Sequence, residues 1–260
     1  MSDYILTPAR VSGATANISI AGPAGSGKTF TALTTMHYLL DLDPQEIKEM
    51  SDSEYDKLLK KPLIAVIDTE RRRILKYANR KRFGFVFHAC FPSNFIHSGL
   101  REAIKQFEKA GYKGVIVDSF SHYWIGHNGI LNLVDKINQS EKGAGWRKVS
   151  PLEKEMWDEL LGSNMHVICT MRAKMEWVYK VDAEGRMLGM EKVGLAPVQR
   201  GDVEYEFDIH IDMDMSHTAR VTKATGDDPD NPTMQDQSFI KPRREIADYV
   251  KEWLALKESA

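Results

Sequence analysis

The chain has 260 residues, of which 42% are hydrophobic and 28% are charged, so it contains enough apolar residues to bury a full core. Its formal net charge of −2 excludes a protein that attracts nucleic acid through an overall basic field, and any such binding would need a local cluster of cations. The N-terminal residues lack the apolar stretch of a signal peptide, and no apolar run reaches the length of a membrane helix. We therefore expect a cytoplasmic protein with no membrane partner.

The two cysteines, Cys90 and Cys169, lie in apolar runs far apart in the sequence, and neither belongs to a CxxC pair. This pattern favours buried free thiols in a reducing compartment over a disulfide or a zinc site.

The first two thirds of the chain alternate between predicted strands and helices. After an irregular arm at residues 1–15, NISIAG (17–22) predicts a strand and residues 28–42 predict a helix. The polar, proline-bounded segment 43–62 is expected to be a surface helical insertion. Further buried strands are predicted at 63–70, 83–91, 114–120 and 166–171, and helices at 93–111, 129–139 and 150–163, the last two separated by a glycine-rich loop at 140–149.

The residue pattern of the last third is typical of antiparallel strands. Residues 176–194 predict a hairpin turning at 183–185, and residues 204–225 predict a second one turning near Ser216 and His217. A loop at 226–232 and a closing amphipathic helix at 244–257 follow. We expect one α/β domain over residues 1–260, with a core at 16–226, a mainly parallel central sheet flanked by helices, an antiparallel C-terminal extension, and the loop and closing helix at 227–260.

Histidines and aspartates in FDIHIDMDMSH raise the question of a metal site. They alternate with Ile209, Ile211, Met213 and Met215, so a strand with one wet polar face explains them better.

The segment GPAGSGKT (22–29) matches G-x-x-x-x-G-K-[ST] at every fixed position, between a predicted strand and a predicted helix. The glycines let several backbone N–H groups point at one anion, and the helix N-terminus assists them. Lys28 is expected to reach the β- and γ-phosphates and Thr29 to ligate Mg²⁺. The expected ligand is ATP with Mg²⁺, and the expected nucleotide-binding residues are Gly22, Pro23, Ala24, Gly25, Ser26, Gly27, Lys28, Thr29 and Phe30.

Acidic residues stand at the ends of two predicted strands. Asp118 ends GVIVD, and because P-loop enzymes need a second acidic group on a neighbouring strand, we expect it to serve Mg²⁺ together with Thr29. Glu70 ends LIAVIDTE, where a carboxylate can orient and deprotonate the water that attacks the γ-phosphate. Strand ends are commonly acidic, so a solvated Glu70 stays open as the alternative.

The order of these motifs resembles that of the RecA-like recombinases. More closely, the phrases IDTER, AGYKGVIVDSFSHYW, HVICTMRAK, KVGLAPVQRGDVEYEFD and ARVTKATG are similar to phage-encoded RecA-like ATPases associated with single-strand annealing and recombination, over residues 17–226. The resemblance implies a RecA-like P-loop NTPase fold, Glu70 as the residue that activates water, and Asp118 as the Mg²⁺ residue. It also implies a phage or prophage protein, a homo-oligomer and single-stranded DNA as partner.

The resemblance is incomplete at the strand end Thr170-Met171, where RecA-like proteins usually carry an Asn-Gln pair whose glutamine senses the γ-phosphate. Thr170 is the remaining candidate for such a contact. Arg172 and Lys174 follow it, and one of them is expected to neutralise the transferring phosphoryl group, in its own subunit or across an interface. Lys223 lies where the family carries lysines that reach a neighbour's nucleotide. Solvated surface cations remain the alternative for all three.

Three segments are rich in cations, and two of them combine these cations with a tryptophan. Residues 70–82 contain seven arginines and lysines, a density that suits a phosphate backbone but also a solvated helix face. Residues 140–149 and 172–180 pair cations with aromatics that could stack unpaired bases, and their positions resemble the DNA-facing loops of the RecA core. The expected DNA contacts are Arg71, Arg72, Arg73, Trp146, Arg147 and Lys148.

The leading hypothesis is a DNA-stimulated ATPase that acts on single-stranded DNA, with Glu70, Lys28 and Arg172 as its catalytic residues. The alternatives are a P-loop nucleotide or small-molecule kinase, which needs an acceptor pocket and an arginine-rich lid, and an ATP-dependent assembly module that does not hydrolyse ATP.

Overall fold

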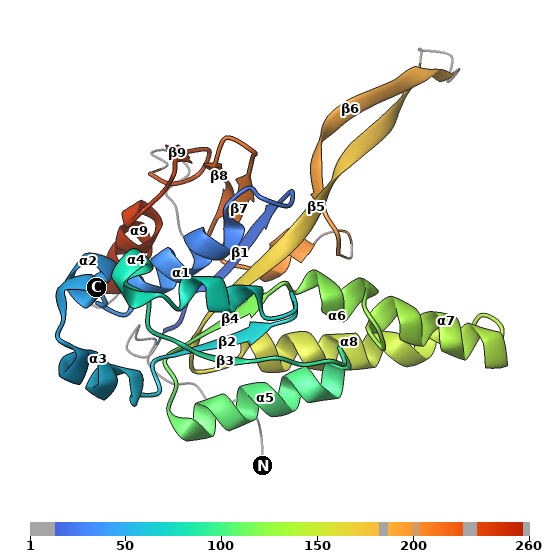
Figure 1. Cartoon of the computed structure of the whole chain (residues 1–260). Helices are drawn as coiled ribbons and strands as arrows, with labels where there is room; N and C mark the ends of the chain where they lie inside the picture. Colours follow the sequence, from blue (N-terminus) through green and yellow to red (C-terminus); the bar gives the residue numbers. More distant parts are fainter. Residues whose placement is uncertain (1–13, 182–186, 200, 202, 226–232, 257–260) are drawn as a thin grey trace.

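The computed structural model describes residues 14–181, 187–199, 201, 203–225 and 233–256. Their strands form one α/β sheet in the order β3-β2-β4-β5-β1-β7-β8-β9, with β6 paired to β5 alone (Figure 1). The five strands β3, β2, β4, β5 and β1 pair in parallel, β7 is parallel to β1, and β8 and β9 are antiparallel. The strands are β1 (Asn17–Gly22), β2 (Ile64–Asp68), β3 (His88–Cys90), β4 (Gly114–Asp118), β5 (His166–Val181), β6 (Met187–Pro197), β7 (Ile209–Met213), β8 (Thr218–Ala224) and β9 (Ser238–Ile240).

Helices cover both faces of the sheet. The helices α1 and α9 contact each other on one face, and α5, α7 and α8 lie on the other (Figure 1). In the described part of the chain, none of the helices combines the length and the apolar character that crossing a membrane requires. The helices are α1 (Lys28–Leu39), α2 (Pro44–Glu49), α3 (Asp52–Leu59), η1 (Arg73–Tyr77), α4 (Arg80–Phe83), α5 (His97–Ala110), α6 (Ser121–Ile125), α7 (Ile130–Ser140), α8 (Gly145–Leu161), η2 (Val203–Glu206) and α9 (Glu245–Leu256).

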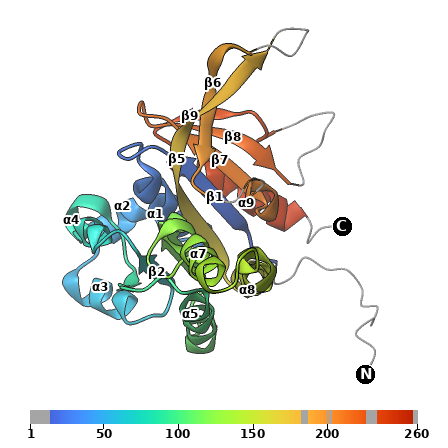
Figure 2. The ribbon, with the colours of Figure 1, turned by 90° about the vertical axis from the view of Figure 1, so that its right-hand side faces the viewer.

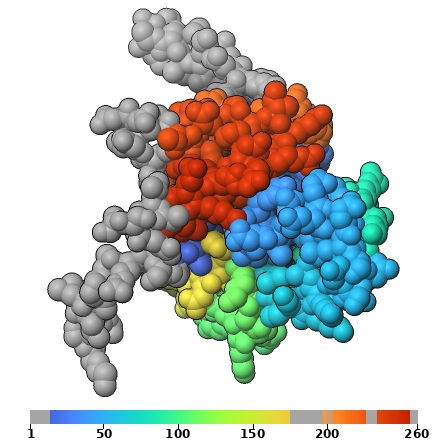
Figure 3. All heavy atoms as spheres, turned by 90° about the vertical axis from the view of Figure 1, so that its left-hand side faces the viewer, coloured from blue at the N-terminus to red at the C-terminus, as the bar shows by residue number. Residues whose placement is uncertain are grey.

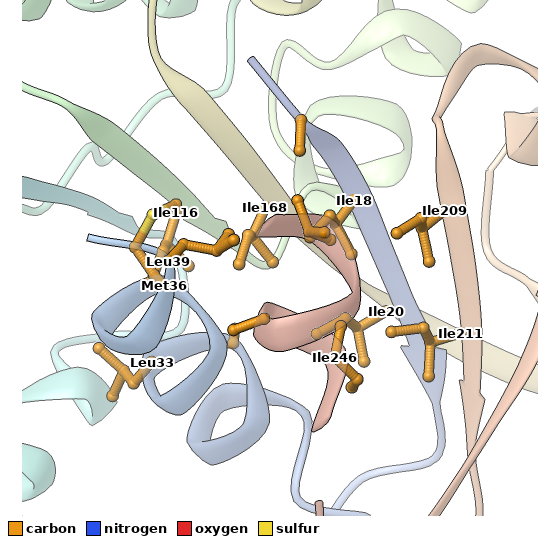
Figure 4. Close-up of a cluster of buried hydrophobic side chains, with 14 of the residues drawn as sticks. Ile18, Ile20, Leu33, Met36, Leu39, Ile116, Ile168, Ile209, Ile211 and Ile246 are labelled. Carbon is orange, nitrogen blue, oxygen red and sulfur yellow. The ribbon is translucent and has the colours of Figure 1, made fainter. Parts of the chain in front are cut away.

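The core forms because the central strands are apolar on both faces. On β1, Ile18 and Ile20 belong to one buried cluster with Leu33 of α1 and Ile246 of α9, and Ile246 lies beside Ile20 (Figure 4). On the opposite face, residues such as Val115 pack against α5 and α8. This double burial is the pattern expected of parallel strands. It fixes the P-loop strand in the middle of the sheet, with the helix that follows it held against one face.

The C-terminal elements lie beside the first helices. In the face shown in Figure 3, the red C-terminal residues adjoin the blue and cyan residues of α1 to α3. Lys251 on α9 pairs with Asp41, directly after α1, and Arg244 lies 5.6 Å from the centre of the Tyr38 ring. These contacts lie at the C-terminal end of α1, whereas Arg243, in the segment between β9 and α9, lies over the Phe30 ring near the N-terminus of that helix, at 4.9 Å.

The strands β5 and β6 form a hairpin that projects from the body of the molecule (Figures 1 and 2). The first part of β5 pairs in parallel with β4 and β1, and its second part pairs antiparallel with β6 from Ala173 onward. Both hairpins predicted from the sequence are present, the second as β7 and β8. The turn predicted at 183–185 and the loop at 226–232 lie outside the described residues, as does most of the predicted arm at 1–15.

Several predicted elements were wrong in extent. The predicted strand at 83–91 is reduced to β3, because Arg80–Phe83 form a short helix and the following residues form a buried loop. The helix predicted from Ser93 begins at His97. The glycine-rich loop predicted at 140–149 is also shorter, since α8 already begins at Gly145. The short elements α6 and β9 were not predicted.

The strand β7 corrects a further prediction, the wet polar face. Ile209, Ile211 and Met213 are buried as expected, but His210 is buried too, and its Nδ1 lies 2.6 Å from the Ser19 hydroxyl on β1. Asp212 on the same face is only partly buried and Asp214, just after the strand, is exposed, so the polar face is open to water only toward the end of β7. Met215, predicted to continue the buried face, is 62% exposed in the turn after β7. Cys169 is buried as predicted, and Cys90 is partly buried.

Candidate nucleotide site

The P-loop connects the end of β1 to the start of α1. Gly27 caps α1 with a φ of 98°, a left-handed conformation that glycine adopts without strain. A Cβ on Gly22 would lie 2.5 Å from the Met213 carbonyl oxygen, so the backbone of β7 approaches too closely for any side chain. The Ser26 hydroxyl is buried and has no hydrogen-bond partner among the described residues. A backbone cradle with a spare buried hydroxyl fits a phosphate chain.

The Lys28 side chain folds back over this cradle. Its Nζ donates hydrogen bonds to the carbonyl oxygens of Gly22 at 2.8 Å and Pro23 at 2.6 Å. Burial lowers the pKa of Lys28 below its ordinary value, and the charges of Asp118 and Glu70 oppose that shift. The ammonium group therefore lies at the centre of the loop, within the electrostatic reach of both acidic strand ends.

The Asp118 carboxylate joins the P-loop helix to two strands. Thr29 Oγ1 donates to Asp118 Oδ2 at 2.8 Å, and Thr170 Oγ1 at the end of the parallel part of β5 donates to Oδ1. Burial raises the pKa of Asp118, and the two threonine hydrogen bonds oppose the rise. A hydroxyl beside a carboxylate is the oxygen donor set that Mg²⁺ takes when phosphate and water supply the remaining ligands. Within the described part of the chain, no cluster of three or more His, Cys, Asp or Glu side chains offers a second metal site.

The Glu70 side chain emerges from a fixed turn after β2. The buried carboxylate of Asp68 accepts hydrogen bonds from the backbone N–H groups of Glu70, at 2.6 Å, and Ile74, at 3.1 Å. The Thr69 N–H donates to the carbonyl of Asp118 at 2.7 Å, so the ends of β2 and β4 are bonded to each other. Asp68 thus has a structural role, and it holds Glu70 at the edge of the sheet where Asp118 also lies.

Both oxygens of Glu70 accept hydrogen bonds from arginines. Arg172 donates to Oε1 from Nε at 3.0 Å and from Nη2 at 2.7 Å. Arg73 Nη1 donates to Oε2 at 3.2 Å. The sequence predicted Arg172 to neutralise a phosphoryl group and Arg73 to contact DNA. Those roles stay predictions; in the structure the two guanidinium groups flank the same carboxylate.

A cavity of about 680 Å³ opens beside the P-loop. The tip of α1, the η1–α4 region and the segment after β9 line it, and Phe30, Tyr77 and Phe83 supply aromatic surface. The cations of the lining are Lys28, Arg73, Lys76, Arg82, Lys241 and Arg243, and no carboxylate is among the lining residues. Such a cavity fits a polyanion with a planar ring attached. The sequence analysis missed Lys241 and Arg243, because no local motif indicates that IKPRR folds back onto Phe30, over which Arg243 lies at 4.9 Å.

A family model described as an AAA domain matches residues 14–237, which include the P-loop, both acidic strand ends and the antiparallel extension. The chain belongs to this AAA domain family. No curated protein matches the chain. Membership makes it a P-loop ATPase of the AAA type, a class that binds nucleotide, usually with Mg²⁺. The mostly parallel sheet with flanking helices and antiparallel C-terminal strands is consistent with this fold.

Other predicted site residues of this AAA domain lie on β5, on β8 and in the turn after β2. Lys174 is exposed on β5. Lys223 on β8 donates to the carbonyl oxygens of Glu204, Tyr205 and Phe207, so within its own chain it caps η2. Arg71 is exposed, and Arg72 lies over the Phe91 ring at 4.9 Å.

The first turn of α8 carries the other predicted DNA contacts of the AAA domain. Trp146, Arg147 and Lys148 are exposed there, on a helix rather than on the loop that the sequence predicted. The Trp146 ring lies 5.9 Å from that of Trp124 on α6, and Lys148 pairs with Glu141 at 2.8 Å.

Proposed function

We propose that this AAA-type ATPase hydrolyses ATP with Mg²⁺ as a RecA-like protein and acts on single-stranded DNA in phage-type annealing or recombination. The observation that carries the ATPase part is the meeting of three groups at one edge of the sheet: the Lys28 ammonium in the P-loop, the Thr29–Asp118 pair, and the Glu70 carboxylate. The charges of both acids act on Lys28, so all three groups belong to one electrostatic site.

Each group has a role in phosphoryl transfer. The P-loop amides and Lys28 bind the β- and γ-phosphates, and Thr29, with Asp118 behind it, holds the Mg²⁺ that bridges them. Glu70 orients a water in line with the γ-phosphate and takes its proton as the new oxygen–phosphorus bond forms and the bond to the leaving ADP oxygen breaks. Thr170, whose hydroxyl donates a hydrogen bond to Asp118, is the residue that senses whether the γ-phosphate is present.

The DNA part is supported by charge and aromatic surface beside this site. Arg71 and Arg72 follow Glu70 directly and are exposed, and Trp146 and Arg147 are exposed near α6. Cations that contact phosphates and aromatics that stack on bases are the means by which proteins bind single strands. The resemblance to phage-encoded RecA-like ATPases also supports a homo-oligomer along the DNA strand, with Lys174 and Lys223 as contacts between subunits. The protein would act in the cytoplasm of a bacterial host.

Two other functions remain as alternatives. A nucleotide or small-molecule kinase would use the cations of the large cavity for a second phosphorylated substrate, but Glu70 then has no water to activate. A non-hydrolysing assembly module would bind ATP and pair strands equally well with a non-hydrolysable analogue. Stimulation of turnover by nucleosides or nucleotides rather than oligonucleotides would favour the kinase.

The test is ATP turnover with and without single-stranded oligonucleotides across a salt series, on the wild type and two variants. Lys28→Ala is expected to lose nucleotide binding, whereas Glu70→Gln is expected to bind ATP and to turn over at least about a hundredfold more slowly. Stimulation by oligonucleotide should fall as salt rises. Unchanged turnover in Glu70→Gln would remove Glu70 from its role, and absence of stimulation at every salt concentration would remove DNA as the partner.

A further inference from the structure

Arg172 occupies the point where the central sheet gives way to the projecting hairpin. Gly22 of the P-loop strand pairs with Arg172, which is the last residue of β5 in the parallel pairing with β1. The next residue, Ala173, is the first to pair with β6, opposite Pro197. Arg172, one of the two arginines that contact Glu70, therefore lies where the parallel part of β5 ends and the hairpin begins.

The backbone of Arg172 is fixed on both sides of this junction. Its carbonyl oxygen accepts a hydrogen bond from the Val198 N–H at 2.6 Å, one residue after β6 ends. Its own N–H donates to the Ser121 hydroxyl at 2.9 Å, at the start of α6. The backbone of Arg172 is thus bonded both to the residue that follows β6 and to α6 in the body of the molecule.

The Glu70 carboxylate has little free hydrogen-bonding capacity in this arrangement. An ionised carboxylate offers about four acceptor positions, and the two arginines fill three of them. The Glu70 side chain is only 14% exposed, so the packed side chains around it, rather than solvent, decide what reaches it. A water that has to be held and deprotonated by Glu70 competes directly with Arg172, which supplies two of the three hydrogen bonds.

We propose that Arg172 is a positioning residue that holds Glu70 in a resting arrangement, and that a single strand bound to the β5–β6 hairpin releases the carboxylate by moving Arg172. This inference rests on the proposed role of Glu70 as the residue that activates water. The hairpin supplies Trp177, Tyr179, Lys180 and Lys192, residue types that bind unpaired bases and phosphates. Binding of the single strand to the β5–β6 hairpin and ATP hydrolysis at the sheet edge are then coupled through the Arg172–Glu70 ion pair.

The matched comparison is between the two arginines on the same carboxylate. Arg172 lies where the hairpin begins, whereas Arg73 belongs to η1, which follows β2 and has no pairing with the hairpin. Releasing either arginine frees a Glu70 oxygen, but only the loss of Arg172 separates Glu70 from the hairpin. Arg172→Lys keeps the positive charge but loses the paired donors of the guanidinium group, so it tests whether the charge alone holds Glu70.

The experiment measures kcat and KM for ATP in the wild type, Arg172→Gln, Arg172→Lys and Arg73→Gln, each with and without an oligothymidylate. Without oligonucleotide, Arg172→Gln is expected to raise kcat about tenfold, because the freed carboxylate serves the water, and to leave KM for ATP within about twofold of the wild type. Oligonucleotide should then add little to Arg172→Gln. The kcat of Arg172→Lys should fall between those of the wild type and Arg172→Gln, because lysine keeps the charge but not the paired donors, and Arg73→Gln should keep the wild-type ratio of stimulated to unstimulated turnover.

A fall of kcat in Arg172→Gln would overturn the inference and would instead put the guanidinium on the transferring phosphoryl group. An unchanged kcat with normal stimulation would overturn it too. The proposed function fails by separate results, namely full turnover in Glu70→Gln or no response of the wild type to any oligonucleotide. Equilibrium binding of a fluorescent ATP analogue to each variant shows that the P-loop is intact in every case.

Discussion

Thr29 and Asp118 meet at 2.8 Å, the hydroxyl at the start of α1 donating to the carboxylate at the end of β4. The strand β5 lies between β4 and the P-loop strand β1, so this contact spans a strand that separates the two motifs in the sheet. It brings together two oxygen ligands that lie 89 positions apart in the chain. A Mg²⁺ ion held by both groups would link the bound nucleotide to β4, on the other side of β5.

Thr29→Val should therefore weaken the binding of ATP with Mg²⁺ about tenfold, which corresponds to about 1.4 kcal/mol. The loss follows because valine has the shape of threonine without the oxygen ligand. Binding of ATP in EDTA should change much less, since the amides of the P-loop are untouched. Isothermal titration with and without Mg²⁺ measures both quantities.

The control for this substitution lies on the same helix. Thr35 carries a buried hydroxyl with no hydrogen-bond partner among the described residues, so Thr35→Val makes the same chemical change without removing a ligand. Its affinity for ATP with Mg²⁺ should equal that of the wild type. Equal losses in the two variants would show that Thr29 acts through packing alone.

The sequence predicted the parts of this site that are encoded locally. The P-loop motif, the apolar strands that end at Asp68 and Asp118, and both hairpins follow from spacing and periodicity over a few residues. The fold-back of IKPRR onto Phe30 could not be predicted in this way, because it depends on how α9 packs against α1 more than 200 residues earlier. The same limit explains why Arg73 and Arg172 were assigned to DNA and phosphate rather than to Glu70.

A second limit concerns helix boundaries and strand faces. Trp146 was placed in a loop because glycines surround it, yet Gly145 is buried, and its N–H donates to the Asn138 side chain at 2.8 Å. That tertiary contact allows α8 to start one turn earlier than propensity suggests. His210 was placed in water because alternation was taken for a half-buried strand, whereas β7 lies between β1 and β8 inside the sheet and His210 packs against Ser19 of β1.

Gly22→Ala is expected to destabilise the folded protein by about 2 kcal/mol, the usual cost of inserting a methyl group into a filled site. The new Cβ would lie 2.5 Å from the Met213 carbonyl oxygen and 2.8 Å from the Ser26 hydroxyl. Met213 cannot yield easily because its strand is paired with β1 and β8. Urea unfolding measures the change.

Gly201→Ala provides the matched control, because no atom of the described residues lies within 4 Å of a Cβ built there. Its unfolding midpoint should stay close to that of the wild type. If Gly22→Ala were as stable as Gly201→Ala, the close approach of β7 to the P-loop would not constrain the loop.

His37 predicts how stability depends on pH. Its ring lies wholly inside the protein, where Nδ1 donates to the Leu33 carbonyl at 2.7 Å and Nε2 accepts from the Val86 N–H at 2.9 Å. Burial lowers the pKa of His37 from 6.5 to about 4, because the charged ring would lose its hydration, and the hydrogen bond to the Leu33 carbonyl opposes this shift only in part.

The sign of this pH dependence follows from the linkage between proton binding and unfolding. Above pH 6.5 the ring is neutral in both states and its contribution to stability is complete; as the pH falls from 6.5 toward about 4, only the unfolded chain takes up the proton. The free energy of unfolding should therefore drop by up to about 1.4 kcal/mol per pH unit over this window. His37→Gln should lack that part of the slope, whereas His127→Gln, at an exposed position, should retain it. Parallel slopes in all three proteins would contradict this account.

The arginines of residues 70–82 should separate into structural and surface groups. Arg80 is buried and donates to the carbonyl oxygens of Met50 at 2.8 Å and Ser51 at 3.1 Å. It also pairs with Asp52 and lies over the Tyr55 ring at 4.8 Å, so it anchors α3 to the body. Arg80→Met should lower stability by about 2 kcal/mol, since it leaves these acceptors without their donor.

Arg71 is exposed beside Glu70 and is free to contact a phosphate backbone. Arg71→Ala should leave the unfolding midpoint unchanged and weaken binding of a single-stranded oligonucleotide, with the slope of log K against log salt reduced by about 0.7 for one lost phosphate contact. Fluorescence anisotropy across a salt series measures that slope. Arg80→Met, studied below its unfolding temperature, should keep the wild-type slope. A reduced slope in Arg80→Met, or none in Arg71→Ala, would place the strand elsewhere on the surface, with Trp146 and Arg147 as the next residues to replace.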